Sequence, residues 1–140
     1  MKRKKAMKIN TSATALLSAL LLSCTYAPTA IAGDGIAGDW TGESICTVRP
    51  SPCNDEHVIY HISEPDAEGK LKIRADKLVN GKPEDMGTLD CTYEAKRSHL
   101  NCQMKNGVWD FDVVGIKMTG TLKLADGTLY RRISVTKSES

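Results

Sequence analysis

The side chains best suited to chemistry in this sequence are three histidines and a pair of aspartates. His57 and His61 lie four residues apart, which on an extended strand separates them by about 13 Å, too far to bind one metal ion. They face different loops, and neither has an obvious carboxylate partner in the sequence. Both, like His99, are expected on the outward phase of their strands. Asp110 and Asp112 share one face of an expected strand at about 7 Å, as solvent-exposed acids on strands commonly do. We therefore predict no catalytic residue, no metal site and a non-enzymatic protein.

Motifs of the common enzyme classes are missing as well. The chain contains no Gly-x-Ser-x-Gly, no phosphate-binding loop and no dinucleotide fingerprint. The acidic run over residues 54–56 has no EF-hand spacing after it, so we expect a solvated loop there. This pattern favours a binding function over catalysis.

The first 32 residues have the composition of a segment that directs export. A basic region over 1–8 precedes an apolar stretch near 9–22, which is too short to span a membrane. Ala30-Ile31-Ala32 is a small-x-small cleavage site, predicting a signal peptide over 1–32 and a linker over 33–37. The alternative is Leu21-Leu22-Ser23-Cys24, which resembles a bacterial lipobox in which Cys24 receives a lipid and anchors the protein to the cell envelope.

Charge excludes a general nucleic-acid binder. The full chain has 19 Lys and Arg against 17 Asp and Glu, a formal charge of +2. Five basic residues and no acidic one lie in 1–32, so 14 basic and 17 acidic side chains follow, a formal charge of −3. Nucleic-acid binding needs a basic surface to meet phosphates. We expect no nucleic-acid partner, and a membrane contact only if Cys24 is lipidated.

Four cysteines follow the predicted signal peptide: Cys46, Cys53, Cys91 and Cys102. An even number of cysteines in a small exported domain predicts two disulfides, each contributing about 2–4 kcal/mol. Three pairings are possible, of which the local one joins Cys46 to Cys53 and Cys91 to Cys102. The competing interpretation is a four-thiolate zinc site, which the lack of a Cys-x-x-Cys pair disfavours.

From Asp39 onward, short alternating segments are separated by turn-forming residues such as Asn80-Gly81 and Asp126-Gly127. The segments predict eight strands near 39–47, 57–63, 70–78, 86–94, 98–104, 107–113, 116–124 and 128–136. Apolar and polar residues alternate with period two, as in strands with one buried face. We predict one all-β domain over 38–137, an antiparallel eight-stranded up-and-down barrel, because closure removes exposed edges. A β-sandwich is the alternative.

Residues near the two ends of the expected domain form a pattern that resembles one found in a known protein superfamily. Gly38-Asp39-Trp40 begins the first expected strand, and Arg131 lies in the last strand, in phase with apolar neighbours. This pattern resembles the calycin superfamily, the lipocalin and avidin relatives, in which Gly-x-Trp packs under a basic residue of the closing strand. The resemblance implies a barrel closed by Arg131 stacked on Trp40. The sequence departs from lipocalins because it lacks their Thr-Asp-Tyr motif and C-terminal helix. It resembles uncharacterised exported bacterial barrels more, and this resemblance implies no substrate.

The predicted inner face allows either a filled core or one small pocket. Gly42, Ala75 and Gly120 leave possible space. The segment 38–42 is also similar to that of nitrobindin-like haem barrels. Haem binding in such a barrel needs an inward histidine, and all three histidines of the sequence lie on the outward phase. We therefore predict no cofactor. The expected inward residues are Trp40, Ser44, Val58, Tyr60, Ile62, Leu71, Ile73, Leu89, Tyr93, Leu100, Met104, Trp109, Phe111, Met118, Leu122 and Leu129.

A second candidate surface is the loop between Cys46 and Cys53. Two prolines restrict it, and Arg49 is expected at its tip, followed by Pro50, Ser51 and Pro52. A preorganised loop binds a partner with a smaller ordering cost. It resembles a disulfide-bounded protease-inhibitor loop up to Arg49, and departs from one at Pro50. In lipocalin-like barrels this connection is the lid over the open mouth.

Two functions follow from these features. The first is a monomeric exported protein, periplasmic or extracellular, that binds a small apolar molecule in or at the mouth of the barrel. Its candidate ligand-binding residues are Tyr60, Tyr93, Trp109 and Met118. The second is an envelope protein-interaction or inhibitor module that uses the loop over 46–53.

Overall fold

The turn-forming residues of the sequence separate eight antiparallel strands. The computed structural model describes residues 35–139; the predicted signal peptide and Cys24 lie outside the described residues. The strands are β1 (Gly38–Cys46), β2 (Glu56–Ile62), β3 (Lys70–Val79), β4 (Lys82–Glu94), β5 (His99–Met104), β6 (Gly107–Val114), β7 (Lys117–Leu124) and β8 (Leu129–Lys137), with a 3₁₀ helix η1 (Ala95–Arg97) after β4. Within 35–139, no helix is long and apolar enough to cross a membrane.

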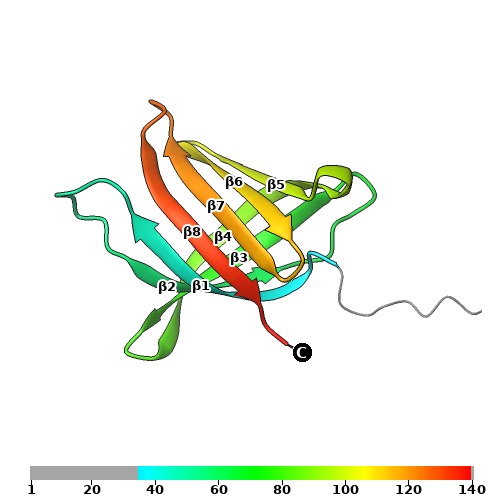
Figure 1. Cartoon of the computed structure of the whole chain (residues 1–140), viewed down its shortest axis with the longest axis horizontal. Coiled ribbons are helices and arrows are strands. Elements are labelled where there is room, and N and C mark those ends of the chain that lie inside the picture. Colours follow the sequence, from blue (N-terminus) through cyan, green and yellow to red (C-terminus); the bar gives the residue numbers. More distant parts are fainter. Residues whose placement is uncertain (1–34, 140) are drawn as a thin grey trace, which may run out of the picture. The chain divides into compact units, whose positions relative to one another are not determined.

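Each strand pairs with the next, and β8 pairs with β1, so the sheet closes into a barrel (Figure 1). The predicted eight-stranded up-and-down barrel is confirmed, and the β-sandwich alternative is wrong. Closure has a physical reason: β1 and β8 would otherwise each present a row of unpaired backbone N–H and C=O groups. Their pairing extends from Trp40 opposite Lys137 to Cys46 opposite Arg131.

The alternating apolar residues fill the interior of the barrel. Trp40, Leu100, Phe111 and Met118 are fully buried. They belong to one cluster that also includes eight residues of β2, β3 and β8 and the two cysteines that join β4 to β5. Met104, at the end of β5, is 47% exposed and lines the cavity described below. The interior is therefore filled at the level of Phe111 and opens toward the end of β5.

The β3–β4 hairpin extends further than predicted. Asn80 and Gly81 both have positive φ, 51° and 76°, which allows a two-residue turn matched to the twist of paired strands. Val79 therefore pairs directly with Lys82, and β4 begins four residues before the predicted start at residue 86.

A β-bulge interrupts this hairpin. Ala75 lies opposite Gly87, but the next residue, Asp76, lies opposite Asp85, so Met86 is an extra residue in β4. Gly87 has a φ of 109°, a backbone conformation that side chains rarely adopt. A bulge reorients the side chain of the extra residue. This local irregularity explains how Met86 comes to line the cavity described below.

The end of the barrel near the start of β1 is closed by Trp40. Its side chain is 1% exposed, and its Nε1–H donates a hydrogen bond of 2.9 Å to the Ile36 carbonyl. The cation nearest its ring is Lys137, whose Nζ lies 5.9 Å from the ring centroid. The expected stacking of Arg131 on Trp40 is wrong. Because β1 and β8 are antiparallel, Arg131 pairs with Cys46, six residues or about 20 Å along the strand from Trp40.

The two glycines expected to leave space in the barrel leave none. A Cβ atom on Gly42 would overlap the carbonyl oxygen of Ser134, and one on Gly120 would overlap the ring of Phe111. Both glycines allow a close approach of neighbouring groups. Of the three positions, Ala75 lines the cavity at one end of the barrel, whereas Gly120 borders only a depression on the outer face.

The cysteines form the local pair of disulfides, Cys46–Cys53 and Cys91–Cys102. The first closes the β1–β2 loop. The second joins residues directly opposite each other in β4 and β5, with a Cα–Cα distance of 4.1 Å. The four-thiolate zinc interpretation is therefore wrong. Two disulfides indicate an oxidising, extracytoplasmic environment.

Candidate functional site

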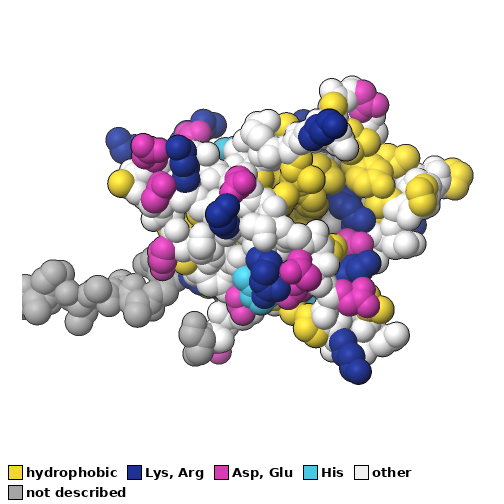
Figure 2. All heavy atoms as spheres, turned by 180° about the vertical axis from the view of Figure 1, so that it is seen from behind, with side chains coloured by type: hydrophobic (Ala, Val, Ile, Leu, Met, Phe, Trp, Pro, Cys, Tyr) yellow, Lys and Arg dark blue, Asp and Glu magenta, His cyan; other side chains and the backbone are white. Residues whose placement is uncertain are grey.

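The end of the barrel opposite Trp40 surrounds a cavity of about 250 Å³. We call this the open end; it includes the loop between β1 and β2 and the turns β3–β4, β5–β6 and β7–β8. Ile36 and Trp40 lie at the other, closed end. Toward the right of Figure 2, hydrophobic side chains gather around a hollow, with basic and acidic side chains beside them. The cavity therefore combines apolar and charged surface.

One side of the cavity is polar, and we call it the polar wall. It consists of Ser44 from β1, Glu56 and Tyr60 from β2, and Arg131 from β8, three neighbouring strands. Nη1 of Arg131 lies 3.1 Å from Ser44 Oγ, 3.3 Å from the Ser44 carbonyl oxygen and 3.3 Å from Glu56 Oε2. Arg131 is only 9% exposed, and pairing with Glu56 offsets part of the cost of burying its charge.

Tyr60 contributes a neutral hydroxyl to the polar wall. Burial raises the pKa of its phenol far above the ordinary value of 10.0, and the positive charge of Arg131 only partly opposes this shift. The phenol therefore keeps its proton at neutral pH and offers one O–H donor in addition to its acceptor lone pairs.

The opposite side of the cavity, the apolar wall, consists of Ala75, Met86, Leu89, Met104 and Trp109 from β3, β4, β5 and β6. Met86 and Met104 are 40% and 47% exposed, which is unusual for large apolar side chains. Trp109 donates its Nε1–H to the Met104 sulfur over 2.9 Å. Methionine side chains adapt to the shape of a ligand, so this wall is suited to an apolar group.

An aromatic cluster connects the two walls of the cavity. Trp109 and Phe111 are stacked with ring centroids 6.1 Å apart and an interplanar angle of 8°. Phe111 in turn meets Tyr60 edge to face at 6.1 Å and 72°. The two walls therefore meet through packed rings, which fixes their relative position.

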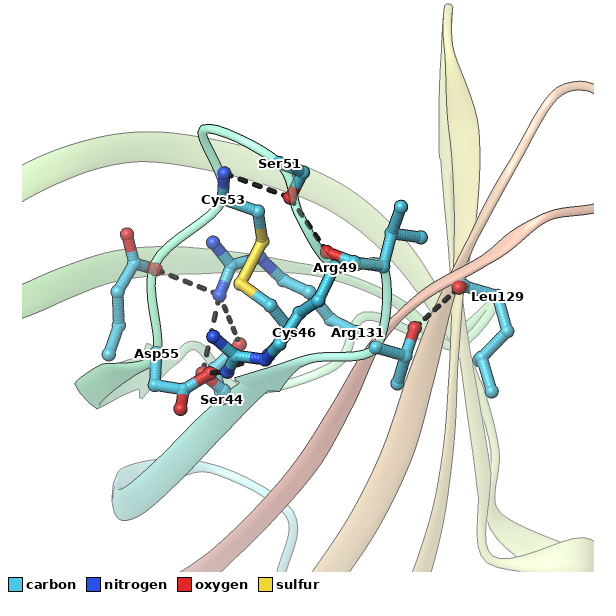
Figure 3. The surroundings of a disulfide bond; sticks show 11 residues. Ser44, Cys46, Arg49, Ser51, Cys53, Asp55, Leu129 and Arg131 are labelled. Atoms are coloured by element: carbon cyan, nitrogen blue, oxygen red, sulfur yellow. Dashed lines mark hydrogen bonds and ion pairs between the residues drawn. A yellow bond between two sulfur atoms is a disulfide. The ribbon is translucent and has the colours of Figure 1, made fainter.

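The disulfide-closed loop lies next to the polar wall (Figure 3). Its predicted interaction residue, Arg49, turns back and pairs with Asp55 at 2.6 Å, and the same carboxylate oxygen accepts the Cys46 N–H at 2.9 Å. Ser51 Oγ donates to the Val48 carbonyl at 2.7 Å. The structure therefore holds the loop from within, and the charge of Arg49 is paired rather than presented alone at a tip.

The four predicted ligand-binding residues are divided between the two ends of the barrel. Tyr60 and Trp109 line the open-end cavity. Met118 is fully buried and pairs with Val135, near the closed end. Tyr93 is half-buried near the end of β4, where its backbone N–H donates a hydrogen bond of 2.7 Å to the Gly69 carbonyl. The structure does not bring Met118 and Tyr93 to the cavity.

Sequence reasoning missed two residues of the cavity. Glu56 was expected in a solvated acidic run, but it begins β2 and meets Arg131. Met86 was not among the expected inward residues; strict alternation from Leu89 would place it on the outer face, and the bulge reverses this. Its only signal in the sequence is the glycine that follows it, since a glycine within a strand often marks a bulge.

His57 and His61 have carboxylate partners that are not obvious in the sequence. His57 Nδ1 lies 2.7 Å from Glu43, and His61 lies 2.7 Å from Asp39 and 3.0 Å from Asp76. These partners lie on adjacent strands and are distant in the sequence, which is why they were missed. Among residues 35–139, no group of three or more His, Cys, Asp or Glu side chains is arranged to hold a metal ion.

His99 bridges the two aspartates that alternate along β6. Its Nδ1 lies 3.0 Å from Asp112 and its Nε2 3.2 Å from Asp110. These carboxylates border a shallow depression of about 360 Å³ on the outer face of β6–β8. The depression is larger than the open-end cavity but is lined mainly by Asp, Thr and Arg side chains, with both carboxylates already engaged. We therefore regard the open-end cavity as the candidate site.

The His99 bridge predicts a pH-dependent contribution to stability. The hydrogen bond to Asp112, opposed by partial burial, holds the pKa of His99 above its ordinary 6.5. When folding raises the pKa of a group, the stabilisation it provides is complete at pH values below the unfolded-state pKa. This stabilisation is lost as the pH rises through the folded-state pKa. Urea unfolding of His99→Gln should lack this pH dependence. A His99 pKa at or below 6.5 by NMR titration would contradict this assignment.

No protein-family model matches the chain, and no curated protein matches it. The likeness to calycins consists of the eight-stranded closed antiparallel barrel. The contact between Trp40 and Arg131 that the resemblance implied is not formed.

Proposed function

We propose that this protein is an exported, calycin-like, non-catalytic binding protein that holds one small apolar molecule in the open-end cavity. The observation that carries the proposal is the arrangement of that cavity, in which four polar residues face five largely apolar ones across the barrel. Binding sites for small molecules typically combine apolar lining with a few placed polar groups.

The size of the cavity limits the ligand. Its volume of about 250 Å³ exceeds the ~150 Å³ that suffices for a single aromatic ring, and lies below the ~300–1,000 Å³ of drug-sized pockets. An eight-carbon chain with one polar head group is a suitable probe. Its chain would contact the apolar wall and its head group the polar wall.

The proposal includes the location and state of the protein. Cleavage after Ala32 would release a monomer into the periplasm or the extracellular space, whereas lipidation at Cys24 would tether it to the envelope. The disulfides support an oxidising compartment for either form.

The test measures binding of octanoate, 1-octanol and octylamine by isothermal titration calorimetry. We expect at least one probe to bind with one-to-one stoichiometry. Ala75→Leu should weaken that binding at least about tenfold, because the added carbons occupy the cavity and overpacking costs about 1–3 kcal/mol. Ala67→Leu is the matched control: the same change at an exposed loop position of the closed end should have no effect. Failure of all three probes, or equal effects of both variants, would refute the proposal.

The second candidate is an envelope protein-interaction or inhibitor module that uses the loop over 46–53. The observation that favours it is the rigidity of the loop, which the disulfide and the Arg49–Asp55 pair provide. On this proposal Arg49→Ala should abolish capture of a protein partner while leaving octanoate binding unchanged.

A further inference from the structure

Arg131 uses only one of its nitrogens within the protein. All of its described polar contacts, to the Ser44 hydroxyl and carbonyl and to Glu56, are made by Nη1. A guanidinium carries five N–H donors, three of them on Nη2 and Nε. In the described part of the chain these two nitrogens have no hydrogen-bond partner, yet no buried side-chain nitrogen or oxygen there lacks one. Nη2 and Nε therefore retain accessible surface, and Arg131 lines the open-end cavity.

The free donors of the polar wall are concentrated on the unused edge of Arg131. The hydroxyls of Ser44 and Tyr60 lie beside it and are hydrogen-bonded to each other. Its one negatively charged group, Glu56, meets Arg131 through a single contact of 3.3 Å and has a side chain that is 20% exposed, against 11% for Arg131. The guanidinium is the more deeply buried charge and cannot lose its proton. A ligand head group that accepts hydrogen bonds would complement this wall.

We propose, as a refinement that rests on the proposed function, that the ligand of the open-end cavity is a small apolar carboxylate. Its head group binds the Nε–Nη2 edge of Arg131, where two parallel N–H donors match the two oxygens of a carboxylate. Its apolar part lies against Met86, Met104 and Trp109.

Glu56 has a defined role in this arrangement. In the empty cavity it keeps the buried charge of Arg131 paired, which avoids the large cost of an isolated buried ion. In the bound state it lies beside a second carboxylate and opposes it, since like charges at short range repel. Glu56→Gln removes this repulsion and leaves Arg131 in place, so it should tighten octanoate binding several-fold.

The test compares three probes of equal chain length: octanoate, neutral 1-octanol and cationic octylamine. We expect octanoate to bind the wild-type protein at least about tenfold more tightly than 1-octanol, because a hydrogen bond between charged groups is stronger than one to a neutral hydroxyl. Arg131→Met should abolish that preference. Arg132→Met is the matched control, because it makes the same change at the next residue, whose side chain is exposed, and it should keep the preference.

The outcomes separate this inference from the proposed function. Equal binding of octanoate and 1-octanol, or a preference for octylamine, would overturn the carboxylate assignment and leave the binding function intact. Absence of binding by every probe would overturn both. If Arg131→Met does not fold, Glu56→Gln decides the question: tighter octanoate binding with unchanged 1-octanol binding supports the inference, and unchanged or weaker octanoate binding contradicts it.

Discussion

Trp40→Ala is expected to lower the free energy of unfolding by about 3–5 kcal/mol, the usual loss when a large buried aromatic side chain is truncated. Trp40 is 1% exposed, and its hydrogen bond to the Ile36 carbonyl ties the segment before β1 to the closed end. The substitution removes the packing and leaves that carbonyl without its partner. Urea unfolding followed by circular dichroism measures the change.

The control for this variant is Trp109→Ala, which makes the same change at the open end. Trp109 is half-buried, with its indole on the Met104 sulfur and on Phe111. We expect a smaller loss of stability and a clear loss of octanoate binding. Equal destabilisation by the two variants would contradict the assignment of Trp40 to closure of the barrel and Trp109 to the cavity.

Removal of the Cys91–Cys102 disulfide is expected to cost about 3 kcal/mol or more. The chain-entropy contribution of a bridge this short is close to 3 kcal/mol. Cys91 and Cys102 are 5% and 0% exposed, so Cys91→Ala/Cys102→Ala also leaves a void between β4 and β5. The change is measured by chemical unfolding of the variant beside the wild-type protein.

The Cys46–Cys53 disulfide provides the comparison. The sequence separations are 7 and 11 residues, and chain entropy alone then differs by only about 0.4 kcal/mol. Any larger difference between the two variants in the free energy of unfolding must come from packing. We expect Cys46→Ala/Cys53→Ala to be the less destabilised variant, because its bridge closes a surface loop. A greater loss of stability for this variant would contradict the packing argument.

The sequence was sufficient to predict the barrel, because period-two alternation and turn residues are local properties of the chain. Leu71 and Ile73 alternate with lysines, and Asn80-Gly81 makes a tight turn wherever it lies between strands. The even number of cysteines after the predicted signal peptide likewise predicted two disulfides. Their pairing followed once Cys91 and Cys102 were placed opposite each other in a hairpin.

The contacts of the site depend on register, which the sequence does not encode locally. Arg131 points inward as predicted, but its position opposite Cys46 assigns it to the open end and to Glu56 instead of Trp40. The bulge at Met86 moves a side chain from one face to the other. The carboxylate partners of the histidines lie on neighbouring strands, so their proximity appears only when the strands are aligned.

The most direct test of the binding site uses the methyl groups of methionine. The described residues contain Met86 and Met104 on the apolar wall and Met118 fully buried near the closed end. In a protein labelled with ¹³C at the methionine methyl groups, titration with octanoate should shift the Met86 and Met104 signals to saturation and leave Met118 unchanged. Unchanged Met86 and Met104 signals, or equal shifts at all three, would contradict a ligand site at the open end.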